Sequence, residues 1–336
     1  MAVPLTDYPF STLPPILQTA MIYYPIIAVF GIPANVITIV ILCQGKCGLS
    51  RCITSYLVAM ASADLLVLIT DVVFWRIKDF YFPNTFLLHT NVCPFNYFLA
   101  RAATDISVWL TVAFTFDRFI TICCQKLRTN YCSKKIAKVV IGSVCLLLCS
   151  KNIPFCFAFG PYYIIDNVAW GCKFKMEYYT EAAWVAFTWT DRSLNPLLPA
   201  FLIILLNART VGSIFTASKI RRKLRESKND ADRNDPEMEN RRKSITLLFT
   251  LSGNFLLLWM TFVIFFVVMR IKKHYYATGF EDPMYITDYI SFMLLLLSTC
   301  TNTCIYAVTQ TKFREELKNG IKYAVQIVCV LLKHSS

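Results

Sequence analysis

Seven long apolar segments constrain the fold of this chain more than any other feature. They cover residues 21–43, 54–76, 89–124, 136–159, 184–215, 244–270 and 284–309. Each is long enough to cross the hydrocarbon core of a bilayer, which takes about 20 residues of α-helix. Because lipid offers the backbone no hydrogen-bond partners, each segment has to be helical. The sequence therefore predicts an all-α membrane protein, a bundle of seven transmembrane helices.

The composition agrees with lipid as the solvent. Of the 336 residues, 56% are hydrophobic and only 16% are charged, which is too apolar for one soluble domain. The net charge of +13 would suggest a nucleic-acid partner in a soluble protein. Here the basic residues lie between the apolar segments, where such charge faces the cytoplasm or lipid headgroups. We therefore expect contact with membrane lipid and no nucleic-acid partner.

The basic residues also predict which side of the membrane each loop faces. Those after the first, third and fifth segments are Lys46, Arg51, Lys126, Arg128, Lys134, Lys135, Lys138, Lys219, Arg221, Arg222, Lys223 and Arg225. By the positive-inside rule these loops are cytoplasmic and the N-terminus is extracellular. We expect an extracellular tail over 1–20, a third intracellular loop over 216–243 and a cytoplasmic region over 310–336. No cleaved signal peptide is expected, because residues 1–20 contain several prolines and no basic residue.

Short motifs lie at characteristic places in these segments. The first three segments contain Gly31-Ile-Pro-Ala-Asn35, Leu57-Val-Ala-Met-Ala-Ser-Ala-Asp64 and, at the cytoplasmic end of the third, Asp117-Arg118-Phe119. The later segments contain Pro199, Phe255, Trp259 and Asn302-Thr-Cys-Ile-Tyr306, followed by Lys312-Phe313-Arg-Glu-Glu. Over nearly the whole chain this pattern resembles the rhodopsin-like (class A) G-protein-coupled receptors.

The resemblance implies a plasma-membrane receptor, not an enzyme, that binds an extracellular ligand and activates a heterotrimeric G protein. It implies a short amphipathic eighth helix within 310–336, with arrestin and a receptor kinase as further partners. It also implies a coupling switch made of Asp117, Arg118, Phe255, Trp259, Asn302 and Tyr306. In that switch Arg118 pairs with Asp117 at rest and faces the G protein when the bundle opens. The alternative for Arg118 is simple anchoring at the basic cytoplasmic surface.

Within the family, one small group is the most similar. The run Ser107-x-Trp109-x-Thr111-Val112, and Asn207 where the family usually has tyrosine, are similar to the orphan receptors proposed to sense aromatic amino acids or peptides. That similarity implies a small-molecule or peptide ligand and favours a G protein of the Gq class.

The chain departs from the family where its helices usually bend. Thr261 stands in place of the proline that follows the span-six tryptophan, Thr303 stands in place of the proline after Asn302, and the fourth segment lacks its expected tryptophan. Because proline kinks a helix, these changes put the size of the activating movement in doubt. A receptor-shaped protein that binds a ligand with weak or no G-protein signalling therefore stays an alternative.

Asp64 lies in the middle of the second segment, where an ionised carboxylate is costly unless it is paired. Helical phasing places Ser107, Ser298 and Asn302 near it. The resemblance implies that these four residues hold an allosteric sodium ion. The alternative is a protonated or hydrogen-bonded aspartate with a structural role.

Two of the 14 cysteines, Cys93 and Cys172, lie clearly in the predicted extracellular part. An oxidising exterior favours a disulfide between them, and the resemblance implies that they form the family's loop staple. The other cysteines lie in the membrane or cytoplasm, where we interpret them as small apolar residues. Cys329 is a candidate palmitoylation site.

The candidate ligand site is inferred from charged residues in the outer halves of the segments. Arg101 and Asp105 are four residues apart on one helical face and could pair. The predicted ligand-binding set is Asp71, Arg101, Thr104, Asp105, Asp191, Arg192, Trp259 and Phe262. Charges of both signs beside aromatic rings suit a zwitterionic or peptide ligand. Alternatively, these charges neutralise one another as a structural network.

Two other functional classes fit the sequence less well. An enzyme is disfavoured, because the three histidines His89, His274 and His334 are scattered and no phosphate loop or nucleophile motif is present. A transporter is disfavoured because the two halves of the chain show no internal repeat. A transporter also predicts polar residues along whole spans. Here they gather in the outer halves of the spans, at Asp64 and at the cytoplasmic end.

Overall fold

The computed structural model describes the backbone of residues 10–82, 85–124, 126–127, 131–226, 236–272 and 280–334. Side chains are described over the same ranges except 218, 220–241, 243, 270–272, 323–325 and 327–334. The side chain of Cys329, the candidate palmitoylation site, therefore lies outside the described residues.

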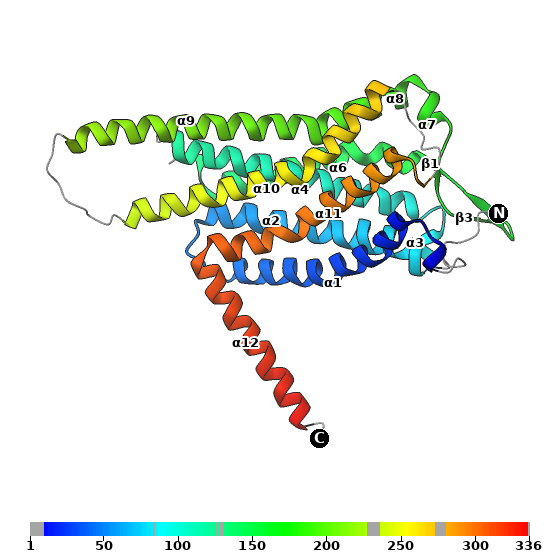
Figure 1. The fold of residues 1–336 in the computed structure, drawn as a ribbon, viewed down its shortest axis with the longest axis horizontal. Helices are drawn as coiled ribbons and strands as arrows, with labels where there is room; N and C mark the ends of the chain where they lie inside the picture. Colours follow the sequence, from blue (N-terminus) through cyan, green and yellow to red (C-terminus); the bar gives the residue numbers. More distant parts are fainter. Residues whose placement is uncertain are drawn as a thin grey trace.

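Seven helical spans run side by side along the long axis of the molecule (Figure 1). The first, third, sixth and seventh are single helices: α1 (Pro15–Cys43), α4 (Cys93–Cys123), α10 (Pro236–Lys272) and α11 (Pro283–Thr309). The second combines α2 (Arg51–Val67), the π-helical η3 (Leu68–Ile77) and α3 (Lys78–Tyr81), and the fourth combines α6 (Lys134–Asn152) with η5 (Ile153–Phe157). The fifth combines α8 (Ala182–Arg192), η6 (Ser193–Leu197) and α9 (Leu198–Glu226). Within the described residues, seven spans are long and apolar enough to cross a membrane, which confirms the predicted fold class.

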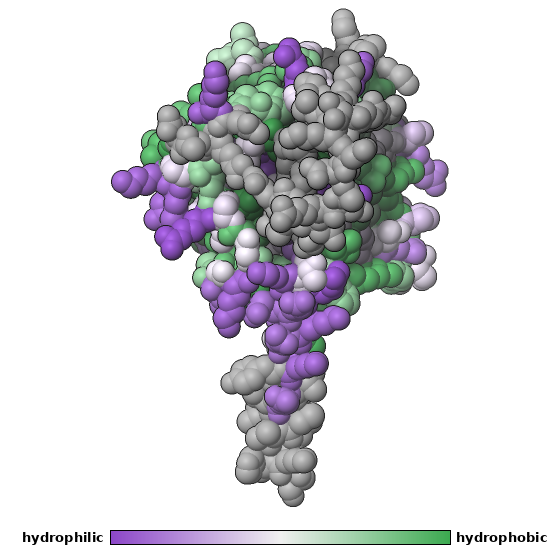
Figure 2. Space-filling model, turned by 90° about the vertical axis from the view of Figure 1, so that its left-hand side faces the viewer, coloured by the Kyte–Doolittle hydropathy of each residue, from purple (hydrophilic) through white to green (hydrophobic). Residues whose placement is uncertain are grey.

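We name the two ends of the bundle after α4, which begins at the Cys93 end and finishes at the Arg118 end. At the Arg118 end an eighth helix, α12 (Thr311–His334), leaves the bundle at a steep angle (Figure 1). Its Phe313 is fully buried against the ring of Tyr306, whereas Lys312 and Arg314 are exposed. Figure 2 views this end and shows hydrophilic residues around it and along the nearer part of α12. The predicted amphipathic eighth helix is therefore confirmed.

The helices extend further than their apolar segments. Helix α1 begins at Pro15, within the tail expected over 1–20. Proline at the first helical position costs nothing, because that N–H has no partner within the helix. Helices α9 and α10 also extend into the loop expected over 216–243, since α9 runs to Glu226 and α10 begins at Pro236. Residues 227–235 of this loop lie outside the described residues. In α9 and α10 polar residues continue the helix beyond the apolar segment, whereas the added turn of α1 packs Leu17 and Ala20 into the core.

A small β-structure covers the Cys93 end. Strands β1 (Phe159–Gly160) and β4 (Lys173–Phe174) pair antiparallel, and between them β2 (Tyr163–Ile165) and β3 (Val168–Trp170) form a hairpin. The hairpin turns at Asp166 and Asn167, which have φ of 50° and 63°; positive φ at both residues is typical of a type I′ turn. Short helical turns complete this end: η2 (Phe10–Thr12), η4 (Phe86–Leu88) and α7 (Glu177–Thr180). A disulfide joins Cys93, at the start of α4, to Cys172 just before β4, as expected.

Candidate functional site

A small cavity lies at mid-bundle around Asp64. Its volume is about 20 Å³, enough for one water-sized occupant. Asp64 is 1% exposed; its carboxylate accepts hydrogen bonds from the Ser107 hydroxyl at 2.5 Å and from the Asn302 amide at 2.7 Å. Helical phasing therefore placed both side chains correctly.

Ser298 also lines this cavity but does not bond to Asp64. Its hydroxyl accepts a hydrogen bond from the indole N–H of Trp259 at 3.1 Å and donates to the backbone carbonyl of Leu295. Trp259 stacks on Phe255, with ring centroids 5.3 Å apart, and meets Phe262 edge to face. The polar cavity and the aromatic stack of α10 are thus directly connected.

At the Arg118 end, the guanidinium of Arg118 is paired with its neighbour Asp117, and both side chains are almost fully buried. Asp117 also accepts a hydrogen bond from the Cys52 thiol at 3.2 Å, and Arg118 donates to the Ser244 hydroxyl of α10 at 3.4 Å. Arg118 therefore bridges α4 and α10. Neither Ser244 nor Cys52 was predicted from the sequence, because only the packing of neighbouring helices brings them to this pair.

Tyr306 is 1% exposed and packs on Phe313. Its hydroxyl has no hydrogen-bond partner among the described residues. Nearby, the hydroxyls of Thr303 and Thr38 lie 2.8 Å apart, and Thr303 also donates to the carbonyl of Ala34 at 3.2 Å. Thr303, which stands where the family usually has proline, therefore joins α11 to α1 by hydrogen bonds.

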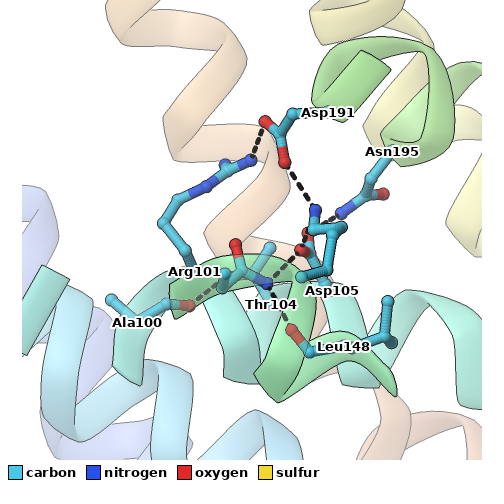
Figure 3. Close-up of polar contacts among 9 residues, drawn as sticks. Ala100, Arg101, Thr104, Asp105, Leu148, Asp191 and Asn195 are labelled. Carbon is cyan, nitrogen blue, oxygen red and sulfur yellow. Dashed lines mark hydrogen bonds and ion pairs between the residues drawn. The ribbon is translucent and has the colours of Figure 1, made fainter. Parts of the chain in front are cut away.

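A buried network of charged groups joins the third, fourth and fifth spans (Figure 3). The ammonium group of Lys151 lies 2.5 Å from carboxylate oxygens of both Asp105 and Asp191, and Arg101 pairs with Asp191 at 2.8 Å. Asp105 is fully buried and also accepts hydrogen bonds from the amides of Asn152 and Asn195. Every carboxylate in this network therefore has a cationic partner.

This arrangement differs from the expected pairing of Arg101 with Asp105. A pair four residues apart on one helix contributes only about 0.2–0.5 kcal/mol. Each residue instead pairs with a charge on another helix, which leaves neither buried carboxylate uncompensated. Lys151 was not among the predicted site residues, although any ionisable residue inside a span suggests a partner on a neighbouring span.

A second charged group lies nearer the first span. Asp71 pairs with Arg76 at 3.1 Å, and Arg76 also donates to the Tyr24 hydroxyl at 2.8 Å. The guanidinium of Arg192 lies 5.5 Å from the ring centroid of Phe262, a cation–π contact. Thr104 donates to the backbone carbonyl of Ala100 and lines the Asp64 cavity. The predicted ligand-binding residues therefore do not surround one cavity: some lie in the charged network, some at the Asp64 cavity and some beside Arg76 and Phe262.

Comparison with known proteins identifies the family. The family described as "7 transmembrane receptor (rhodopsin family)" matches residues 34–306, which is most of the chain. The chain belongs to the rhodopsin family of seven-transmembrane receptors. This family consists of multi-pass membrane receptors that signal, not of enzymes, so the resemblance inferred from Asp64, Asp117-Arg118 and Tyr306 is confirmed.

Several curated relatives of this receptor are named for peptides. It is 24% identical over 83% of its length to the tachykinin-like peptides receptor 86C of Drosophila melanogaster, covering 53% of that protein. It is 22% identical over 93% of its length to the neuromedin-K receptor of Homo sapiens, covering 62% of it. It is also 28% identical over 45% of its length to G-protein coupled receptor 39 of Bos taurus, covering 34% of it. The chain therefore spans less than two thirds of the length of each of these relatives.

Proposed function

We propose that this protein binds an extracellular ligand at its Cys93 end and activates a heterotrimeric G protein at its Arg118 end. The observation that carries the proposal is the buried Asp117–Arg118 pair, which is linked to α10 through Ser244. An arginine cannot lose its charge at physiological pH. Separating α10 from α4 removes the Ser244 contact and opens the space beside the Asp117–Arg118 pair, which stays on α4. A G-protein helix entering the opened end then meets Arg118.

The orientation follows from the basic loops at the Arg118 end. Under the positive-inside rule that end faces the cytoplasm and the N-terminus is extracellular. The protein is then a multi-pass protein of the plasma membrane, with the Cys93–Cys172 disulfide outside, where oxidising conditions preserve it.

Ligand and G protein act on one conformational equilibrium. A ligand activates only if it binds the open form more tightly than the closed one, and the same condition holds for the G protein. The stacked rings of Phe255 and Trp259 lie between the two ends and contact the Asp64 cavity through Ser298. We propose that this stack repacks when α10 moves.

For the ligand, we propose a peptide or an aromatic amino acid. Two relatives are named for peptides, the tachykinin-like peptides and neuromedin K. Within the charged network, Asp105 and Asp191 are neutralised by Lys151 and Arg101, which favours a structural role for that group. We propose that the ligand meets Arg192 and Phe262 first, where a guanidinium lies over an aromatic ring, and then Asp71, which offers the ligand its ion pair with Arg76.

An allosteric sodium ion is proposed for the Asp64 cavity. A hard cation prefers oxygen ligands, and the carboxylate of Asp64 with the hydroxyls of Ser107 and Ser298 provides them around about 20 Å³ of space. The amide nitrogen of Asn302 faces Asp64, so its role is to orient the carboxylate. An ion held there would stabilise the charge of Asp64 and the closed form.

Other partners follow from the family resemblance alone. We propose coupling to a G protein of the Gq class, and binding of arrestin and a receptor kinase at the same cytoplasmic end.

A cell-based G-protein dissociation assay tests the proposal. Cells that express the full chain are exposed to aromatic amino acids and to tachykinin-like peptides, and each G-protein class is monitored separately. The expected result is a ligand-dependent signal that Arg118→Ala abolishes while surface expression persists. Ligand binding without dissociation of any G protein would instead identify a receptor-shaped binding protein. Flux of a substrate across the membrane would identify a transporter.

A further inference from the structure

An open groove lies on the surface of α9, towards the Arg118 end of the bundle. Its volume is about 500 Å³, and α9 runs along one edge of the bundle (Figure 1). The residues that line it all belong to this one helix, and most of them are small: Ala208, Arg209, Gly212, Ser213, Thr216 and Ala217. A Cβ added to Gly212 would meet no described atom within 4 Å. No described part of the chain therefore fills the groove.

Arg209 brings a cation into this groove. Its side chain is exposed, and among the described residues no carboxylate forms an ion pair with it. A guanidinium stays charged at physiological pH, and a charge that faces hydrocarbon without a partner is costly. Arg209 therefore needs an anion that the described part of the protein does not provide.

The surface of α9 changes from basic to apolar along this face. Lys219 is exposed and follows Thr216 by three residues, so a second cation lies just beyond the groove. In the other direction Leu205 precedes Arg209 by four residues, and Phe201 precedes Leu205 by four. These two apolar side chains are 41% and 62% exposed. Cations, open space and an apolar stripe thus follow one another in the order of a lipid's headgroup and acyl chains.

The groove lies at the depth where headgroups meet the protein. Its residues, 208–217, are the last part of the fifth span, which covers Ala182–Ala217. The chain beyond it is basic, with five lysines and arginines between residues 219 and 225. With the orientation proposed above, this side faces the cytoplasm, where anionic lipids give the membrane a negative surface potential. Charge complementarity therefore favours an anionic lipid over a zwitterionic one.

We propose that this groove binds one anionic phospholipid of the cytoplasmic leaflet, with its phosphate on Arg209 and its acyl chains along Leu205 and Phe201. A guanidinium binds a phosphate through two parallel hydrogen bonds. The hydroxyl of Ser213, four residues after Arg209 on the same face, donates to a further phosphate oxygen. The site depends neither on the extracellular ligand nor on a G protein, and only the choice of leaflet rests on the proposed orientation.

The test measures lipid binding to the full chain in detergent by native mass spectrometry. The protein is titrated separately with phosphatidylserine and with phosphatidylcholine. The first phosphatidylserine should bind at least about fivefold more tightly, because its headgroup has a net negative charge beside Arg209 and Lys219. Arg209→Gln should lower the affinity for phosphatidylserine about tenfold, the effect of losing hydrogen bonds between charged groups.

Matched variants separate a defined site from general attraction to a basic surface. Arg314→Gln removes an exposed arginine of α12 at the same end and should leave the affinity unchanged. Gly212→Leu fills the groove while every charge stays, and should weaken binding as much as Arg209→Gln does. Gly142→Leu makes the same change on α6, where an added Cβ also meets open space, and should have no effect. Thermal unfolding in phosphatidylcholine checks that each variant is folded.

Inorganic phosphate distinguishes a lipid site from a site for a free anion. It should not displace phosphatidylserine, because it has no acyl chains to contact Leu205 and Phe201. Displacement by phosphate would overturn the proposal in favour of a free-anion site. Equal affinity for the two lipids would also overturn it, as would equal losses in Arg314→Gln and Arg209→Gln, which would indicate only a diffuse basic surface. Unchanged binding in Gly212→Leu would show that the groove is not the site.

Discussion

Lys151 and Asp105 form an ion pair at 2.5 Å between the fourth and third spans, and the same ammonium group lies equally close to Asp191. The Lys151 side chain is 16% exposed and the two carboxylates at most 2%. One cation therefore compensates two buried anions, and its removal should be costly. Lys151→Met should lower the free energy of unfolding by about 3–5 kcal/mol, the range for breaking a buried pair, as measured by thermal unfolding in detergent.

Lys134 provides the control for this prediction. It lies on the same helix and is exposed, so Lys134→Met removes an equal charge and should change stability by less than about 0.5 kcal/mol. Adding Asp105→Asn to Lys151→Met should recover part of the loss, because one buried charge is then gone. Equal stability of the Lys151→Met and Lys134→Met variants would show that the network is not structural.

The Asp64 cavity predicts stabilisation by sodium. Sodium chloride should raise the unfolding temperature of the protein above that in choline chloride at equal ionic strength, because an ion that binds only the folded state stabilises it by mass action. Asp64→Asn should abolish this difference. Asp79→Asn, which removes an exposed carboxylate from the same span, should keep it. No sodium effect in the unchanged protein would favour the alternative of a structural aspartate.

The sequence was enough to predict the mid-bundle contacts, because regular helices carry them. Ser107 and Asn302 lie on α4 and α11, and simple phasing brings both to Asp64. The Asp117–Arg118 pair and the Cys93–Cys172 disulfide came from motifs that the family shares. Each of these predictions needed only regular geometry or a matching pattern.

The outer charged groups could not be predicted in this way, because their helices are irregular. Asp71 and Arg76 are five residues apart and pair within π-helical η3, where hydrogen bonds join residues at that spacing. Asn195 has non-helical φ and ψ of −153° and 112° inside η6. The change in direction there lets its side chain reach Asp105, a contact that α-helical phasing does not produce.

The disulfide predicts equal effects of two single substitutions. Cys93→Ser and Cys172→Ser should each lower stability by about 2–5 kcal/mol, and the double variant should be no worse than either, because all three lose the same bond. Surface expression and the thermal unfolding of each variant measure the loss of stability. Cys145→Ser, at a free cysteine of α6, is the control. Additive losses from the two substitutions would mean that each cysteine acts independently.

Substitutions at Thr303 test how the absence of the family's proline at this position affects signalling. Its hydroxyl binds Thr38 and the Ala34 carbonyl, and its backbone N–H continues the helix α11. Thr303→Val removes only the hydroxyl and should cost about 1 kcal/mol. Thr38→Val should cost about the same, and the two together less than the sum, because they share one bond.

Thr303→Pro removes both the hydroxyl and the N–H, and introduces a kink. It should destabilise the closed bundle further, and raise basal nucleotide exchange above that of Thr303→Val. The comparison of the two variants separates the lost contact with α1 from the added bend. Higher exchange only in the proline variant would show that the kink sets the ease of activation. Equal exchange in both would assign that control to the bond between Thr303 and Thr38.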